Sequence, residues 1–326
     1  MPPNKTHNLQ LKFVGPIPEI DPNYTLVSCS VSNSGDGLFL YIMDDPNDDV
    51  HGRIVRGASF AKTKMPAGKT FKLIIKSENK HREILIDKIN FTYPTFDVFN
   101  DGRVVIAGGR TQWRSKDDYD LNGLIFDPSS GERIRFLAGD GIENLSVDDK
   151  SRLFISYFDE GIFGNNGWNH PGPAGPGAGG LCCFNAKGEL NWQFNSVDGS
   201  GEFISDCFAM NVSGEHTYIY YYTDFSLCEI GPEFETAFWR PNLSGCNNFA
   251  IDENVIVFSG QYHDPSTRFY LLKRLLNHLS KPVPLSVNLE FGQLIWSNKT
   301  ICRGAHIHHF NEDGWFRSSI SSLAKF

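Results

Sequence analysis

The sequence predicts an all-β fold, a β-propeller of about six blades built as a single domain over residues 1–326. Aromatic residues, which favour strands, make up 13% of the chain, and 31 glycines can supply tight turns. A pattern of apolar strand, polar turn and second apolar strand also recurs six times. With 40% hydrophobic residues the chain can bury a sizeable core.

The six predicted hairpins each carry Asn, Asp or Gly in the turn, which favours a tight reversal between strands. The strand pairs are residues 26–31 with 38–42, 96–99 with 104–107, 145–147 with 153–158, 208–212 with 218–222, 249–251 with 255–259, and 306–310 with 315–320. Their turn centres lie 39 to 65 residues apart, a spacing typical of four-stranded blades with variable loops.

Second hairpins supply the remaining strands of several units: residues 71–75 with 81–87, 124–126 with 133–137, and 181–184 with 190–194. A two-sheet sandwich is the alternative, but twenty or more short strands are too many for it. Residues 270–279 fit either a short helix or a strand followed by a loop. The Pro- and Gly-rich residues 171–180 are expected to form a long surface loop.

The two ends of the chain predict how the sheet closes. The sixth unit reaches Phe326 before a fourth strand can form, whereas residues 9–14 form a strand without a neighbour. Pairing of residues 9–14 with the strands of residues 300–326 would remove the last free sheet edges.

Composition excludes several classes of function. A net charge of −8 disfavours direct binding to nucleic acid or to an anionic membrane. No apolar run has the length of a membrane span, and the polar amino terminus lacks the core of a secretory signal. Seven cysteines without a Cys-x-x-Cys pair indicate reduced, packed thiols. We therefore expect a cytoplasmic protein that is monomeric in the free state.

Motifs for chemistry are scarce. A Gly-x-Ser-x-Gly elbow is missing, and the glycine clusters at residues 108–109 and 139–141 do not open a helix that could hold phosphate. His306 and His308 would share one face of the first strand of a blade, which lines the channel. They are weak metal candidates, because the sequence nominates no third ligand. No cofactor is expected.

The connections between second and third strands gather acidic residues, and in a propeller these loops leave by one face. They hold eleven acids: Asp44, Asp45, Asp48, Asp49, Asp117, Asp118, Asp120, Asp159, Glu160, Asp224 and Asp264. With only Arg110, Arg114 and Lys116 as bases, the excess equals the whole net charge. If the first loop extends to Lys69 it gains five bases, and the excess falls to three.

Aromatic residues in the same loops indicate an interface, because aromatic side chains surrounded by charges are typical of binding surfaces. The predicted partner-binding residues are Asp44, Asp45, Asp48, Asp49, Trp113, Asp117, Asp118, Asp159, Glu160, Phe163, Trp168, Tyr262 and Asp264. Tyr119 belongs to the same loops.

Residues 157–164 (Tyr-Phe-Asp-Glu-Gly-Ile-Phe-Gly), followed by Gly180-Leu181 and Trp192, resemble a stretch found in bacterial propeller proteins. Some of these resemble immunity proteins paired with contact-dependent or other polymorphic toxins. The resemblance covers about a quarter of the chain and implies a cytoplasmic binder of a cognate toxin, without catalytic residues.

Two functions from different classes follow. The first is a non-catalytic propeller that binds a protein, with a basic nuclease-type toxin as the partner of its acidic loops. The alternative is a lactonase-like or sugar-processing hydrolase or lyase with a metal or small ligand in the channel. The chain shares the six-blade plan with such enzymes, but their ring of acid and Asn ligands cannot be aligned to it. A scaffold with merely variable loops is a third reading.

Overall fold

The computed structural model describes residues 7–45, 48–55, 58–60, 62–78, 80–194, 202–261, 268–276, 278–294 and 299–325. Strands predominate among them, and the helix α1 (Asp159–Phe163) is only five residues long. The chain divides into two compact units. Unit 1 combines Met1–Ile17 with Phe208–Phe326, and unit 2 is Pro18–Cys207.

Within the described residues, unit 2 contains three antiparallel sheets of four strands, each formed by strands that follow one another along the chain. Their strands are β2 (Tyr24–Val31), β3 (Gly37–Met43), β6 (Lys69–Lys76) and β7 (His81–Ile89); β8 (Pro94–Val98), β9 (Val104–Gly108), β12 (Gly123–Phe126) and β13 (Arg133–Phe136); and β14 (Ile142–Val147), β15 (Leu153–Tyr157), β16 (Leu181–Phe184) and β17 (Leu190–Gln193). Two small hairpins, β4 (Arg53–Val55) with β5 (Ala58–Phe60) and β10 (Trp113–Ser115) with β11 (Asp118–Tyr119), lie in their connections.

Unit 1 holds a four-stranded sheet and a larger sheet of eight strands, again among the described residues. The first has β18 (Asp206–Ser213), whose first two residues belong to unit 2, then β19 (His216–Tyr222), β20 (Ser226–Ile230) and β21 (Thr236–Trp239). The second has the order β22-β23-β24-β25-β1-β28-β27-β26. Its strands are β22 (Asn248–Ile251), β23 (Val255–Ser259), β24 (Phe269–Lys273), β25 (Val283–Leu289), β1 (His7–Gly15), β28 (Gly314–Ser319), β27 (His306–Asn311) and β26 (Lys299–Arg303).

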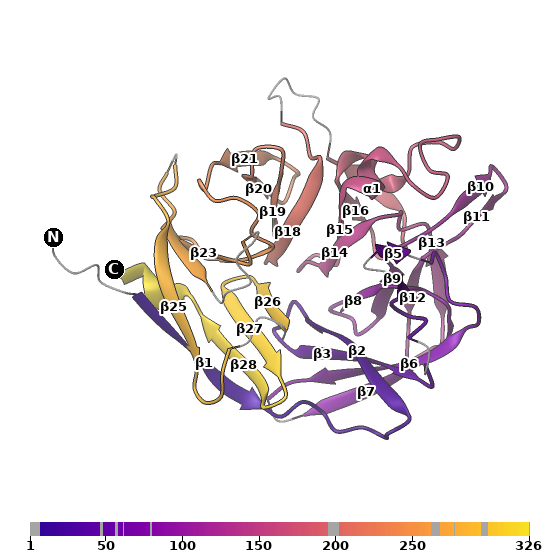
Figure 1. Ribbon diagram of the computed structural model, residues 1–326, viewed down its shortest axis with the longest axis horizontal. Coiled ribbons are helices and arrows are strands. Elements are labelled where there is room, and N and C mark those ends of the chain that lie inside the picture. Colours follow the sequence, from indigo (N-terminus) through magenta and orange to yellow (C-terminus); the bar gives the residue numbers. More distant parts are fainter. Residues whose placement is uncertain are drawn as a thin grey trace. The chain divides into compact units, whose positions relative to one another are not determined.

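Strand β1 pairs with two strands along different halves of its length. Its first half runs parallel to β25, with Leu9 opposite Val287, and its second half runs antiparallel to β28, with Phe13 opposite Phe316. Figure 1 shows β1 beside both strands. The predicted pairing of residues 9–14 with the carboxy-terminal strands is confirmed, and the pairing with β25 is an addition to it.

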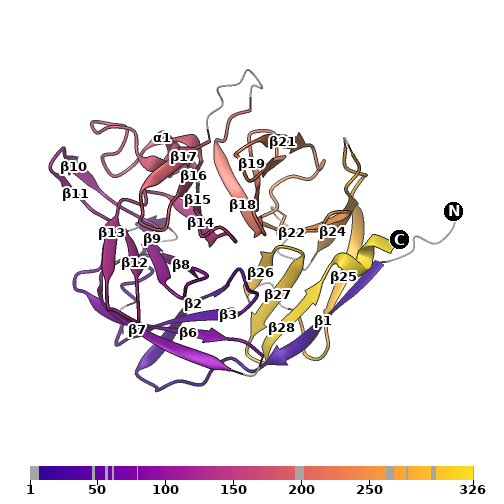
Figure 2. The ribbon, with the colours of Figure 1, turned by 180° about the vertical axis from the view of Figure 1, so that it is seen from behind.

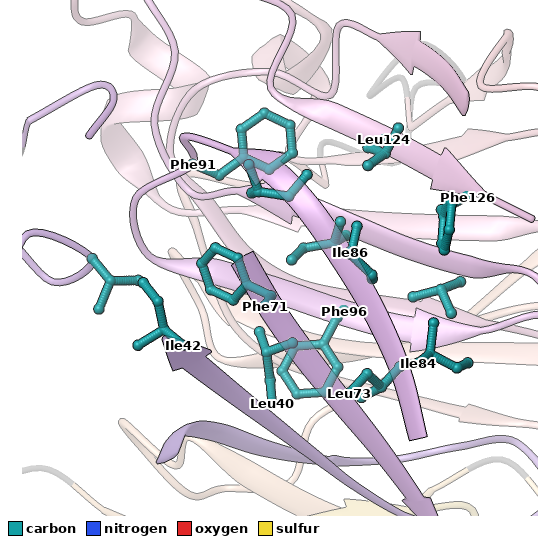
Figure 3. Close-up of a cluster of buried hydrophobic side chains, with 14 of the residues drawn as sticks. Leu40, Ile42, Phe71, Leu73, Ile84, Ile86, Phe91, Phe96, Leu124 and Phe126 are labelled. Carbon is teal, nitrogen blue, oxygen red and sulfur yellow. The ribbon is translucent and has the colours of Figure 1, made fainter. Parts of the chain in front are cut away.

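The core of unit 2 follows from the difference between inner and outer strands. The residues of β3 are buried along almost its whole length, whereas only three positions of the outer strand β7 are buried. Leu40, Leu73 and Ile84 lie opposite one another on three neighbouring strands and form part of the cluster in Figure 3. Burial of each such side chain contributes about 1.5–3 kcal/mol to stability.

Repeated four-stranded meanders are the building unit of β-propellers, so the predicted fold class is confirmed, while the number of blades and the single domain stay predictions. The predicted hairpins are all present. Among the described residues of 270–279, the first four belong to β24 and Arg274 forms an isolated bridge with Leu279, so the strand alternative holds there rather than the helix. Among the described residues, no helix combines the length and the apolar character needed to cross a lipid bilayer.

One strand assignment was wrong. The hairpin β27–β28 was predicted to be the first and second strands of the sixth unit, but β26 precedes it and pairs with β27. The two are therefore the second and third strands of their group, and β1 completes it as the fourth. Strand β26 has only two apolar residues, which are adjacent, and so lacks the apolar alternation that identified other strands.

Candidate functional site

Two connections of unit 2 come together and are here called the loop platform: residues 109–122 between β9 and β12, and residues 158–180 between β15 and β16. The first carries the β10–β11 hairpin, and the second carries α1 and a 3-10 helix, Pro176–Gly179. The backbone N–H of Trp113 donates to the carbonyl oxygen of Asn166 at 3.0 Å. A Cβ on Gly167 would lie 2.2 Å from the Trp113 carbonyl oxygen, so only glycine permits this approach. Figure 2 shows α1 and the hairpin at the same end of the unit.

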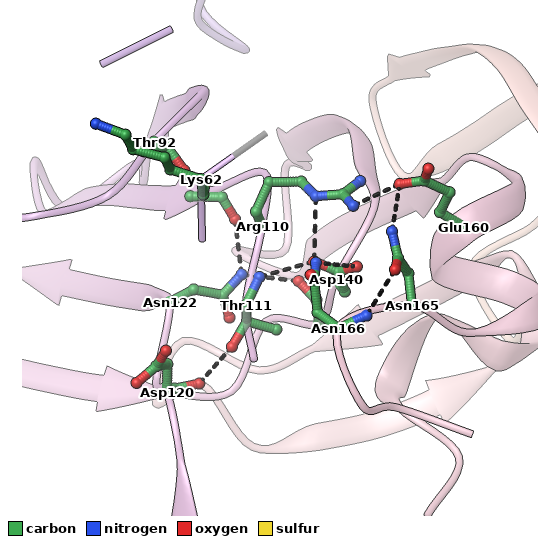
Figure 4. Close-up of polar contacts among 12 residues, drawn as sticks. Lys62, Thr92, Arg110, Thr111, Asp120, Asn122, Asp140, Glu160, Asn165 and Asn166 are labelled. Atoms are coloured by element: carbon green, nitrogen blue, oxygen red, sulfur yellow. Dashed lines mark hydrogen bonds and ion pairs between the residues drawn. The ribbon is translucent and has the colours of Figure 1, made fainter. Parts of the chain in front are cut away.

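A buried arginine joins the two loops. The Arg110 side chain is 7% exposed, and its Nε lies 3.4 Å from Oδ1 of Asp140, which is 2% exposed. Its Nη2 forms an ion pair with Glu160 of α1. Asp140 also accepts hydrogen bonds from the Thr111 N–H at 2.8 Å and from Nδ2 of Asn166 at 3.2 Å, as Figure 4 shows. This network fixes the position of α1 relative to the β9–β12 connection.

The two carboxyl groups in this network have opposite pKa shifts. Burial raises the pKa of Asp140 despite the nearby Arg110 guanidinium and the hydrogen bonds that favour its ionised form. Burial also acts to raise the pKa of Glu160, but hydrogen bonds from Asn165 and Arg110 outweigh it and lower that pKa. Glu160, predicted to bind a partner, thus already has an intramolecular partner.

The acids Asp44, Asp45, Asp48 and Asp49 already contact nearby backbone groups and bases. The carboxylate of Asp45 accepts hydrogen bonds from the N–H groups of Asp49 at 3.1 Å and Val50 at 3.0 Å. Asp49 pairs with Lys62 at 3.1 Å, and Asp48 contacts His51 at 2.8 Å. Asp44 is exposed, and its carbonyl oxygen accepts a hydrogen bond from Lys69.

In the β10–β11 hairpin most acids are also paired. Arg114 contacts Asp118 at 2.7 Å and Asp120 at 2.8 Å, and Lys64 contacts Asp120 at 3.4 Å. Hydrogen bonds from Arg114 lower the pKa of Asp118 and of Asp120. Asp117 is exposed and has no basic partner among the described residues. Three bases between Asp49 and β6 therefore contact the acidic loops: Lys62, Lys64 and Lys69. They are among the five bases that the first loop gains if it extends to Lys69.

The predicted aromatic residues fall into two groups. Trp168 is buried, with 5% of its surface exposed, and Trp113 is half-buried. Phe163 is 59% exposed and packs at a centroid distance of 6.1 Å on Phe203, which is 45% exposed. Phe163 and Phe203 therefore form an exposed aromatic pair at the end of α1.

Three carboxylates without a basic partner among the described residues lie near one another in unit 2: Glu143, Asp159 and Asp206. Burial, followed by the charge of Asp206, raises the pKa of Glu143 to about 7. Burial, followed by the charge of Asp159, raises the pKa of Asp206 to about 6. We call these three carboxylates together with Phe163 and Phe203 the aromatic–acidic surface.

Sequence reasoning identified Asp159 and Phe163 but missed the other three members. Glu143 lies on β14, two residues before the predicted strand 145–147, and Phe203 and Asp206 lie where the chain enters β18. The sequence signal that could have identified Glu143 is a carboxylate between the apolar residues Ile142 and Leu145. Tyr262 and Asp264 lie outside the described residues. Asp224 belongs to unit 1, 3.6 Å from Nη2 of Arg240.

The loop platform also borders a pocket of about 530 Å³, lined by Trp113, Tyr119 and Trp168 together with the strand β17. Tyr119 and Trp168 pack edge to face at a centroid distance of 6.1 Å. Most of the lining is apolar, and Lys116 is its one charged residue. The pocket has the size of a small-molecule site, for which about 300–1,000 Å³ is usual.

The two weak metal candidates lie on β27 in unit 1. His308 is 1% exposed, and its Nδ1 accepts a hydrogen bond from Nε1 of Trp315 at 3.1 Å. Burial lowers the pKa of His308 and of His306. Among the described residues, no three His, Cys, Asp or Glu side chains are grouped so that they could hold a metal ion.

No family model matches the chain, and no curated protein matches it in sequence. Similar solved structures include the β-propeller domain of the Trilobed protease from Pyrococcus furiosus, which is 10% identical over 88% of this chain and 78% of that chain, with a TM-score of 0.42. YCF48 bound to D1 peptide is 7% identical over 95% of this chain and 92% of that chain, with a TM-score of 0.43. A gluconolactonase from Xanthomonas campestris is 10% identical over 94% of this chain and 87% of that chain, with a TM-score of 0.27. The fold assignment rests on the sheet topology, and these likenesses are too distant to transfer a function.

Proposed function

We propose that this β-propeller is a non-catalytic binding protein whose aromatic–acidic surface takes a basic protein partner. The observation that carries the proposal is the exposed pair of Phe163 and Phe203 beside carboxylates that have no basic partner among the described residues. Exposed aromatic side chains surrounded by charge are typical of the centre of an interface.

The aromatic pair supplies the apolar part of the contact. Phe163 leaves 59% of its surface exposed, and a phenylalanine can bury about 150–250 Å² on binding. Aromatic residues near the centre of an interface often contribute more than about 2 kcal/mol to binding.

The carboxylates supply charge complementarity. Glu143 and Asp206 have raised pKa values partly because negative charges lie close together. A lysine or arginine of the partner would neutralise this repulsion and favour the ionised carboxylates. Such a charge pattern speeds the encounter with basic proteins more than with neutral or acidic ones.

The Arg110 network gives this surface a rigid base. Glu160 belongs to the same helix as Phe163 and is held by Arg110. A Cβ on Gly161 would lie 2.3 Å from the Asp140 carbonyl oxygen, so the helix sits directly against the β13–β14 connection. Little ordering of α1 is then required on binding, which favours affinity.

The partner we propose is a basic nuclease-type toxin, with this chain acting in the cytoplasm as its immunity protein. Residues 157–164, on which the resemblance to propeller immunity proteins rests, include all of α1. Two of their three exposed members, Asp159 and Phe163, belong to the aromatic–acidic surface, and the third, Glu160, is paired with Arg110.

Binding to the small basic proteins encoded beside its gene tests the proposal. Phe163→Ala is expected to weaken binding by about 30-fold, mainly through faster dissociation. Asp159→Lys is expected to slow association several-fold and to reduce its dependence on salt. Leu85→Ala, at a side chain 56% exposed on β7, and Glu132→Lys, at an exposed turn, are the matched controls. Equal binding by all four variants, or no binding of any neighbouring gene product, would refute the proposal.

A further inference from the structure

The pocket beside the loop platform is lined mainly by apolar and aromatic side chains, which suit a flat, apolar molecule. Trp113, Tyr119 and Trp168 all line it, and Pro176 of the 3-10 helix adds a further apolar wall. Trp168 and Tyr119 are held edge to face, and Trp168 is 5% exposed. Aromatic walls favour aromatic ligands, which they contact by stacking or edge to face.

The charge of the pocket selects an anion. Lys116 is the one charged residue of the lining, is exposed, and has no ion pair among the described residues. The neighbouring base Arg114 is occupied by Asp118 and Asp120. Asp117 lies next to Lys116 in the turn but does not line the pocket. A ligand that enters the pocket therefore meets an ammonium group and no carboxylate of the lining.

Two other polar groups of the walls are buried or already bonded within the protein. Nε1 of Trp168 is buried and has no hydrogen-bond partner among the described residues. Nε2 of Gln193 donates to the Pro176 carbonyl oxygen at 2.8 Å, which fixes that amide in the wall. The exposed Lys116 ammonium is a donor only, so a ligand that supplies acceptor oxygens is complementary to it.

We propose that this pocket binds a small aromatic carboxylate, with its ring among Trp113, Tyr119 and Trp168 and its carboxylate at Lys116. The pocket lining shares no residue with the aromatic–acidic surface, and the inference does not rest on the proposed protein partner. Charge-assisted contact with the ammonium would distinguish the acid from a neutral ligand of the same shape.

Calorimetric titration of the full-length protein with 2-naphthoate, and with the neutral 2-naphthamide, tests the proposal. We expect one naphthoate per chain, and about tenfold weaker binding of the amide. Lys116→Gln should weaken naphthoate binding about tenfold and leave amide binding unchanged, because it removes only the charge. Trp113→Ala should weaken both ligands. Lys187→Gln, at an exposed turn of the same unit, is the control and should change neither.

Equal affinities for acid and amide, or the absence of binding by both, would overturn the proposal. Binding of a peptide that ends in a free carboxylate on tryptophan, without binding of naphthoate, would also overturn it and identify a chain terminus as the occupant. Phe163→Ala should leave naphthoate binding unchanged, so this site and the proposed protein interface can fail independently of each other.

Discussion

At the scale of single residues, Asp140 and Glu160 share one arginine but have different surroundings. The Asp140 side chain is 2% exposed and also accepts hydrogen bonds from Thr111 and Asn166, whereas the Glu160 side chain is 46% exposed. Arg110 itself is buried, so without Asp140 its charge would be balanced only by Glu160, whose side chain is 46% exposed. Removal of one member of a buried pair is far more destabilising than loss of an exposed one.

We therefore expect Asp140→Asn to lower the free energy of unfolding by about 3 kcal/mol. Equilibrium denaturation with urea measures the change. Asp117→Asn removes an exposed acid of the same loop platform and should have almost no effect. A loss of less than about 0.5 kcal/mol in Asp140→Asn would show that the network does not stabilise the fold.

The raised pKa of Glu143 predicts a pH effect with a definite sign. The folded protein has a pKa of about 7 at Glu143, against the usual 4.5, so it binds more protons than the unfolded chain between these values. Stability therefore decreases as the pH rises through this window. Surrounding protein atoms restrict the hydration of the Glu143 carboxyl group, but the side chain still reaches solvent, so the effect on the melting temperature is expected to be small. Glu143→Gln should remove it. Carboxyl NMR titration measures the pKa directly, and Asp206→Asn should lower it. A Glu143 pKa near 4.5 in the wild-type protein would contradict this prediction.

At the scale of single elements, β1 contributes buried side chains to a sheet whose other strands come from the far end of the chain. Leu9 is 4% exposed and Leu11 is 0% exposed, whereas Gln10 between them is exposed. Leu11 belongs to the same core cluster as Leu289 and Phe316. The alternation fixes which face of β1 meets the core.

Leu11→Ala is expected to lower the free energy of unfolding by about 3 kcal/mol, because it leaves a cavity in this core. Deletion of residues 1–14 should be more destabilising, since it also exposes the edges of β25 and β28. Gln10→Ala is the control. A deletion variant that melts within about a degree of the full-length protein would contradict the role of β1.

The fold was more predictable from the sequence than the site. Apolar runs and turn residues identified the hairpins, because each depends on neighbours within a few residues. The strand β26 was missed because its two apolar residues, Ile301 and Cys302, are adjacent and do not alternate with polar ones. The ion pairs of Arg110 join residues 110, 140 and 160, which no local pattern connects. Asp159 and Phe163 were predicted because they lie in one loop that combines acids with aromatic residues. Phe203 and Asp206 come from a later segment, which no local pattern connects to that loop.

At the scale of the whole molecule, unit 1 is discontinuous in sequence. It contains Met1–Ile17 and Phe208–Phe326, with all of unit 2 between them. The pairing of Phe13 with Phe316 spans about 300 residues. Contacts of such long range form late in folding because closing the intervening chain is entropically unfavourable.

We therefore expect Leu11→Ala to change unfolding kinetics and not folding kinetics. If β1 joins after the rate-limiting step, the unfolding rate should rise about a hundredfold and the refolding rate should stay close to that of the wild type. Stopped-flow measurements over a range of urea concentrations give both rates. A refolding rate that falls in proportion to the loss of stability would place β1 in the folding nucleus instead.

The double pairing of β1 also makes one strand exchangeable between molecules. During refolding at high concentration, β1 of a neighbouring copy can compete with the molecule's own β1 for the edges of β25 and β28. Two copies that exchange this strand would form the same strand pairs and bury the same leucines as the monomer. The dimer would therefore differ from the monomer in molecular mass but not in its circular dichroism spectrum. We therefore expect the fraction of strand-exchanged dimer in a refolded sample to increase with the protein concentration during refolding.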